Sequence, residues 1–236
     1  MSAPLFKMSV SQSEITKTRR RLPHWKCDGA IYWVTFRLAD SIPREMIQTW
    51  KLEREDWLSY HPESWSEMIG KEYEQRFGER IENWLDAGTG SRALAREDVR
   101  EVVKACFFRF DGEHLVVHSA VVMPTHVHLL IEPLEVVSGS SGNGQTGVSA
   151  SHSGSEFHDL SKLLKGIKGA SARAANRILG TSGTFWLEES FDHIVRSEAQ
   201  YHHFLQYIAE NPVKAVLRRD EYWLMEGGPD IPVCQS

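Results

Sequence analysis

Two apolar runs with a two-residue join constrain the fold of this chain more than any other feature. The runs 114–123 and 126–133 are rich in β-branched residues, and only Pro124 and Thr125 separate them. Runs of this length and composition are typical of strands. Because so short a join makes the two strands antiparallel neighbours, the sequence predicts a β-hairpin over 114–133.

Other periodic segments surround this hairpin. The run 30–38 reads as a buried strand, and the aromatic-rich segment 185–196 contains a further one. Helices are expected over 43–86, 96–108, 157–179 and 197–211, the last with a capping box of Ser197 and Gln200 and with Pro212 as its end. This order predicts an α+β fold: a ferredoxin-like core with a central antiparallel sheet and helices on one face, plus a long helical insertion.

The length of 236 residues suits one elaborated domain. We expect it over 25–220, with 41–110 as a helical insertion in the first crossover. A flexible basic arm, 1–24, precedes it and a tail, 221–236, follows. The Gly/Ser-rich segment 138–155 is expected to be a disordered loop without a role in chemistry.

The composition points to a cytoplasmic protein with no membrane partner. No apolar run approaches the length of a membrane span, and the N-terminal residues lack the apolar stretch of a secretion signal. The three cysteines, Cys27, Cys106 and Cys234, show no zinc-ribbon or redox spacing, which favours reduced thiols.

A net charge of −5 argues weakly against nucleic acid, but the charge is unevenly distributed. Residues 41–90 hold eleven acids and six bases, so the rest of the chain is close to neutral. Two stretches are basic, and each is either a solvated face or a phosphate-binding surface. They consist of Lys17, Arg19, Arg20, Arg21 and Lys26, and of Lys162, Lys165, Lys168, Arg173 and Arg177.

Two histidines alternate on the second strand of the hairpin. His126 and His128 share one face of that strand, about 7 Å apart, whereas Val127 and Leu129 point to the other face. Two imidazoles on one rigid strand make half of a divalent-metal site. His-x-His pairs are common, however, and many of them only pack.

A tyrosine and an asparagine share one face of the last helix. Tyr207 and Asn211 are four residues apart, off the apolar stripe that includes Phe204, Leu205 and Ile208. Taken alone, the tyrosine is explained by packing and the asparagine by the end of a helix.

Together these segments resemble a known family. MPTHVHLLI (123–131) resembles the histidine–hydrophobic–histidine strand of HUH endonucleases. FWLEESFDHIVR (185–196) followed by YIAENPVKAVL (207–217) resembles the C-terminal half of IS200-like transposases, and LPHWKCDGAIYWVTFRLAD (22–40) resembles the opening strand of the REP-associated tyrosine transposase branch. The segments 41–110 and 138–155 lie outside this resemblance.

The resemblance implies a transposase-type enzyme that cuts and rejoins single-stranded DNA near hairpins. It makes Tyr207 the nucleophile and His126, His128 and Asn211 the ligands of Mg²⁺ or Mn²⁺. It assigns no role to His193. The 5′ phosphate would stay on the tyrosine, and the enzyme would work as a monomer or a homodimer.

Phosphate contacts are expected from the two basic stretches. A base could stack on Trp25 or Trp186, although each is more easily explained as a core residue. The phosphate contacts would come from Arg19, Arg20, Arg21, Lys162, Lys165 and Lys168.

Two other functions remain open at this point. A catalytically silent, domesticated protein would bind hairpin DNA without cutting it. A metallohydrolase acting on small molecules or peptides could also use His126 and His128. It ranks last, because the chain has no carboxylate near the pair and this function gives Tyr207 no role.

Overall fold

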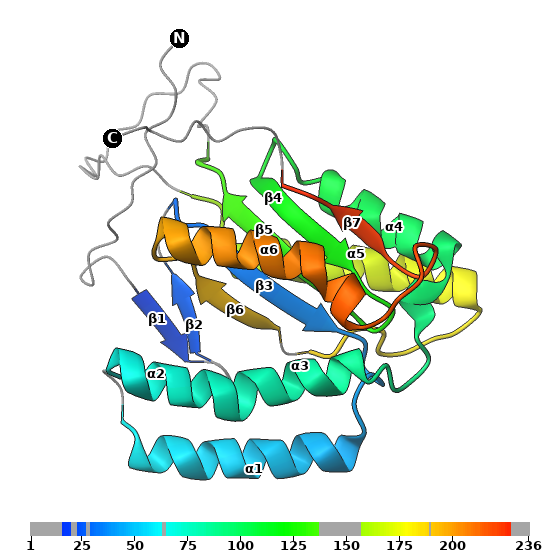
Figure 1. Cartoon of the computed structure of the whole chain (residues 1–236). Coiled ribbons are helices and arrows are strands. Elements are labelled where there is room, and N and C mark those ends of the chain that lie inside the picture. The colour runs from blue at the N-terminus through cyan, green and yellow to red at the C-terminus, as the bar shows by residue number, and fades with distance from the viewer. Residues whose placement is uncertain are drawn as a thin grey trace, which may run out of the picture.

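A computed structural model describes residues 16–19, 23–26, 29–62, 65–136, 157–188 and 190–227. Its centre is a five-stranded antiparallel sheet in the order β6-β3-β5-β4-β7 (Figure 1). The strands are β3 (Tyr32–Arg37), β4 (Leu115–Val122), β5 (His126–Pro133), β6 (Phe191–Ile194) and β7 (Trp223–Met225). When β7 is set aside and the other four strands are numbered in chain order, their order across the sheet is 4-1-3-2, which is the order of a ferredoxin-like sheet. The predicted α+β class is therefore confirmed.

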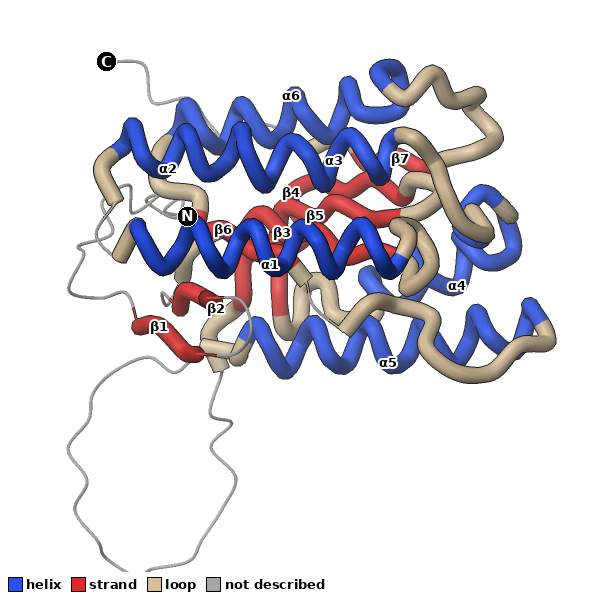
Figure 2. The backbone as a smooth tube through the Cα atoms, turned by 90° about the horizontal axis from the view of Figure 1, so that it is seen from below, coloured by secondary structure: helices blue, strands red, loops and turns tan. Residues whose placement is uncertain are grey.

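Helices cover both faces of this sheet (Figures 1 and 2). On one face, α4 (Glu97–Phe108) and α5 (Leu160–Leu179) pack against apolar residues of β3 and β5, as expected of the two crossover helices. On the opposite face lies α6 (Glu198–Lys214), whose Ile208 is buried with Trp33 and Leu130 of the sheet. The prediction placed helices on one face only. The apolar stripe of α6 needs a partner, and the second face of the sheet supplies it.

The insertion between β3 and β4 begins with a helical hairpin. Its first arm is α1 (Arg44–Tyr60), and its second arm runs from α2 (Glu67–Tyr73) through a π-helical turn (Glu74–Gly78) into α3 (Glu79–Asp86). Trp50, Trp57 and Phe77 form a core of their own between the two arms. The helical region predicted over 43–86 is therefore real but folds back on itself after Tyr60. Among the described residues, no helix has both the length and the apolar character needed to cross a bilayer.

The last helix does not end at Asn211, so that prediction was wrong. Helix α6 continues through Pro212 to Lys214. A proline in the last turn removes one N–H, but the carbonyls around it are still used: Ala215 N–H bonds to the Asn211 carbonyl and Leu217 N–H to the Pro212 carbonyl, both at 3.0 Å. One lost hydrogen bond is too small a cost to end the helix there.

Two terminal segments contain strands that the sequence patterns did not reveal. In the segment expected to be a loose arm, β1 (Thr16–Arg19) pairs with β2 (Pro23–Lys26) as a separate two-stranded sheet. In the expected tail, β7 pairs with β4, and Ser119 Oγ donates a hydrogen bond to the Met225 carbonyl at 2.9 Å. Strands of three or four residues are too short to show a clear alternation.

The Gly/Ser-rich segment 138–155 lies outside the described residues, so its expected disorder stays a prediction. On either side of it, Glu135 and Phe157 form an isolated antiparallel bridge.

Candidate active site

The two histidines of β5 lie on the face of the sheet that α6 covers. His126 and His128 are 1% and 0% exposed, and their ring centroids are 4.7 Å apart. Alternation along the strand puts them on one side, while Val127 and Leu129 join the core on the other. The imidazoles are therefore neighbours in a buried, preformed position.

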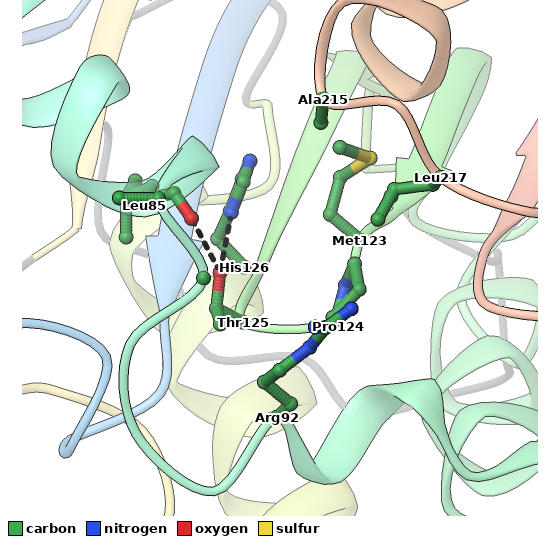
Figure 3. Close-up of a pocket in the computed structure, with 10 residues that line it drawn as sticks. Leu85, Arg92, Met123, Pro124, Thr125, His126, Ala215 and Leu217 are labelled. Atoms are coloured by element: carbon green, nitrogen blue, oxygen red, sulfur yellow. Dashed lines mark hydrogen bonds between the residues drawn. The ribbon is translucent and has the colours of Figure 1, made fainter.

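Each imidazole has a threonine hydroxyl at its Nδ1. Thr35 Oγ1 lies 2.8 Å from His128 Nδ1, and Thr125 Oγ1 lies 2.9 Å from His126 Nδ1. Thr125 also donates its hydroxyl proton to the Leu85 carbonyl at 3.2 Å (Figure 3), so it accepts a hydrogen bond from the Nδ1–H of His126. Protonation at Nδ1 leaves the lone pair on Nε2, where a metal ion binds.

An aromatic stack fixes the plane of His128. Trp33 of β3 stacks on the His128 ring with centroids 4.8 Å apart and an interplanar angle of 16°. Phe204 of α6 also stacks on Trp33, at 4.6 Å. Because the indole contacts both rings, it couples the helix to the histidine strand.

Tyr207 meets this cluster from α6. Its ring stands edge-on to His128, with centroids 5.4 Å apart, and edge-on to Trp33 at 5.3 Å. Lys214, two turns later, places its Nζ 5.4 Å from the centroid of the Tyr207 ring. Since the tyrosine is half-buried, its ring is held in place while part of it remains open to solvent.

Asn211 contributes a buried amide oxygen to α6. It is 1% exposed and lies one turn after Tyr207 and one turn before Ala215, which lines a pocket together with His126. Within the described part of the chain, Asn211 Oδ1 makes no hydrogen bond, and neither do the Nε2 atoms of His126 and His128, whose rings are engaged elsewhere. A buried amide oxygen without a partner costs free energy, which a bound cation would offset.

The available donors are neutral. Among the described residues, no group of three or more His, Cys, Asp or Glu side chains is placed to hold a metal ion. Two imidazole nitrogens and one amide oxygen carry no charge of their own. A divalent ion held by them would keep its full charge for an anionic ligand such as a phosphate.

His193, which had no assigned role, packs beside this cluster. Gln200 Oε1 accepts a hydrogen bond from the Arg196 N–H, so its amide nitrogen donates to His193 Nε2 at 2.8 Å. Burial, and to a lesser extent the charge of Arg196, lower the pKa of His193 to about 4. A neutral imidazole that is hydrogen-bonded in this way positions the start of α6.

The three predicted phosphate-binding lysines, which the structure describes, do not join the histidines. Lys162 and Lys165 are exposed on α5, which lies across the sheet from the site, and Lys168 donates to the carbonyls of Leu187 and Glu188. Arg20 and Arg21 lie outside the described residues, and Arg19 is described only through its backbone in β1.

Of the two tryptophans that could stack a base, Trp186 is a core residue: it is 4% exposed and donates to Ser171 Oγ. Trp25 is described only through its backbone.

Sequence reasoning missed the residues that support the cluster: Thr35, Thr125, Trp33 and Lys214. Thr125 directly precedes His126, and Lys214 lies seven positions after Tyr207, so spacing offered a signal for these two. Thr35 and Trp33 are near His128 because of the register between β3 and β5, which pairs Thr35 with His128. No local pattern reveals that register.

Comparisons with known proteins give only distant likenesses. No protein-family model and no curated protein matches the chain. One solved structure that it resembles is a REP-associated tyrosine transposase bound to a REP hairpin, with 16% identity, a TM-score of 0.40 and coverage of 84% of this chain and 73% of that one. Another is a protein from Deinococcus radiodurans R1, provisionally named a transposase, with 14% identity, a TM-score of 0.27 and coverage of 86% and 98%. Because the TM-scores are this low, neither likeness supports a function for this chain.

Proposed function

We propose that this chain is a metal-dependent nuclease and strand transferase of the HUH tyrosine type. It would cleave single-stranded DNA beside hairpins through a covalent 5′-phosphotyrosine. One arrangement carries the proposal: Tyr207 of α6 stands against His128 of β5 in the same chain, beside His126. The resemblance to REP-associated tyrosine transposases selected these residues from sequence, although the helix α5 and the strand β6 lie between them in the chain.

His126, His128 and Asn211 would hold the metal ion. Their nitrogen and oxygen donors suit Mn²⁺, and Mg²⁺ is the abundant cellular alternative. The fit is supported by the buried Asn211 oxygen and by the threonine hydroxyls that engage each Nδ1. A divalent ion bound there polarises the phosphodiester and stabilises the negative charge that develops on its oxygens.

Tyr207 would act as the nucleophile. Its phenol oxygen loses a proton and forms a bond to phosphorus, the bond between phosphorus and the 3′ oxygen breaks, and that oxygen leaves as a hydroxyl after taking up a proton. The 5′ phosphate remains on the tyrosine, so a 3′ hydroxyl can later attack it and restore a strand without ATP. Lys214 places its ammonium over the Tyr207 ring and is also ion-paired with Glu210 at 2.9 Å.

One chain is sufficient for this chemistry. Tyr207 contacts His128 of the same chain, His126 lies beside His128, and Asn211 is buried one turn after Tyr207. A monomer would therefore be active, and a homodimer would carry two independent sites.

The experiment uses single-stranded oligonucleotides that tile the DNA on either side of the protein's own gene, including any imperfect hairpins. We expect cutting at a defined position with Mn²⁺ or Mg²⁺, and none with EDTA. His126→Ala and His128→Ala should not cut. His202→Ala is the matched control, because His202 is an exposed histidine of α6 and its loss should leave cutting unchanged.

Undiminished metal-stimulated cutting by either alanine variant of the strand histidines would remove them from the mechanism. If the wild-type protein binds a hairpin tightly and never cuts it, the enzyme proposal fails. The silent hairpin-binding alternative would then stand.

A further inference from the structure

A pocket of about 240 Å³ opens beside His126 (Figure 3). The end of α3 and the segment that follows it form one side of it, with Leu85 and Arg92. The residues that follow α6 line the other side, where Ala215 and Leu217 lie opposite. The pocket is smaller than the roughly 300–1,000 Å³ of typical small-molecule sites, so it suits a unit of about one nucleotide.

The lining of the pocket combines apolar and polar side chains. Met123, Ala215 and Leu217 are apolar, whereas Arg92 and His126 are polar. A nucleotide has the same division, with an apolar base face and an anionic phosphate. Arg92 is suited to the phosphate, because a guanidinium has five N–H donors and its hydrogen bond from Nη2 to Glu221, at 2.9 Å, engages only one of them.

Backbone strain occurs at this pocket. Among the described residues, only two other than glycine have a positive φ: Arg92 at 49° and Val216 at 52°. Arg92 lines the pocket, and Val216 lies between Ala215 and Leu217, which also line it. Left-handed conformations cost free energy in residues with a Cβ and concentrate where a site has to be shaped.

We propose that this pocket binds the nucleotide of the substrate strand next to the scissile phosphate. Arg92 contacts a backbone phosphate, and the apolar residues Met123, Ala215 and Leu217 contact the base or sugar. This inference rests on the proposed function. It also gives a role to the insertion that begins at residue 41, because the turn after α3 and the segment up to Arg92 form one wall of the DNA site.

The test uses an oligonucleotide that the wild-type protein cuts. It is synthesised with one uncharged methylphosphonate linkage, moved in turn to each position, and its binding is measured by fluorescence anisotropy in EDTA. For the wild type, a neutral linkage adjacent to the cut should weaken binding by about tenfold or more. Arg92→Ala should weaken binding of the unmodified strand by a similar factor and lose its sensitivity to that linkage only.

Glu221→Gln separates a DNA contact from a structural role. It breaks the same ion pair but leaves the guanidinium in place, so binding should stay equal or become tighter. Arg96→Ala is the control for loss of one exposed positive charge near the insertion, and it should leave the sensitivity to that linkage intact.

The proposal is overturned if Arg92→Ala keeps the wild-type sensitivity, or if Glu221→Gln weakens binding as much as Arg92→Ala does. In either case continued cutting by the wild type would leave the proposed function standing. Failure of the wild type to cut any oligonucleotide would overturn both.

Discussion

The Tyr207 ring stands edge-on to the His128 ring of its own chain, with centroids 5.4 Å apart and an interplanar angle of 89°. The contact arises because α6 folds back onto the sheet that carries β5, with Trp33 packed between the helix and the histidine. The proposed nucleophile and metal ligands are thus assembled in cis.

If the site is assembled within one chain, two variants that are each inactive should not restore activity to one another. Tyr207→Phe and His128→Ala should each be inactive, and a mixture of the two should stay inactive, because neither chain contains a complete site. The measurement is cutting of the oligonucleotide by each variant alone and by the pair after joint refolding. Recovery toward about a quarter of the wild-type rate in the mixture, from the one complete site of each mixed dimer, would mean that the tyrosine acts on the histidines of a partner chain.

Thr35 should be needed for tight metal binding. Its hydroxyl lies 2.8 Å from His128 Nδ1, so Thr35→Val removes the group that orients the ring and should weaken Mn²⁺ binding by about 10–100-fold. Thr35→Ser, which retains the hydroxyl, should bind nearly as well as the wild type. Titration of Mn²⁺ followed by electron paramagnetic resonance measures the affinity without any cleavage. Equal affinities for the valine and serine variants would show that the hydroxyl does not orient a ligand.

His193 should make the fold sensitive to mild acid. Its pKa is lowered to about 4, chiefly by burial, so from about pH 6.5 down to 4 the unfolded chain binds a proton that the folded chain does not. Stability therefore falls as the pH falls through this window, with a loss of about 2 kcal/mol between pH 7 and pH 5. Urea unfolding at the two pH values measures the difference.

His193→Gln should lack most of this loss, whereas His202→Gln, at an exposed position of the same region, should keep it. An identical pH dependence in the wild type and in His193→Gln would contradict the assignment.

Val216→Gly should stabilise the protein. Val216 and Leu217 donate to the carbonyls of Val213 and Pro212 and close α6 in a Schellman motif, in which the left-handed position is usually glycine. Removing the β-branched side chain at φ 52° should add about 1 kcal/mol to the free energy of unfolding. Val213→Gly is the matched control: this exposed residue is helical, so its change should destabilise by a few tenths of a kcal/mol. If chemical denaturation gives Val216→Gly a lower free energy of unfolding than Val213→Gly, the strain at Val216 is refuted.

Local patterns were sufficient for most of the fold. The two-residue join at Pro124 and Thr125 identified the β4–β5 hairpin, and the Ser197–Gln200 spacing located the start of α6, where Ser197 Oγ accepts from the Gln200 N–H. The patterns failed where tertiary contacts decide. Pro212 is accommodated because later N–H groups use the neighbouring carbonyls, and β7 exists because β4 has an open edge.

Local patterns also predicted one part of the candidate site and missed another. Alternation placed His126 and His128 on one face, and helical spacing paired Tyr207 with Asn211. Whether the two pairs meet depends on how α6 packs on the sheet. Periodicity does not reveal this packing, and only the family resemblance grouped the four residues into one site. Lys168 shows the opposite case: its spacing suggested a phosphate contact, but its ammonium is hydrogen-bonded to two backbone carbonyls.

The most direct test of the account is to identify the residue that becomes attached to DNA. The wild-type protein is incubated with a cut oligonucleotide and Mn²⁺, digested, and analysed by mass spectrometry for a nucleotide-bearing peptide. The account predicts the adduct on Tyr207, its absence with EDTA or in Tyr207→Phe, and its persistence in Tyr201→Phe, where the lost hydroxyl is a buried one that contacts His118. An adduct on any other residue, or one that forms undiminished in Tyr207→Phe, would contradict it.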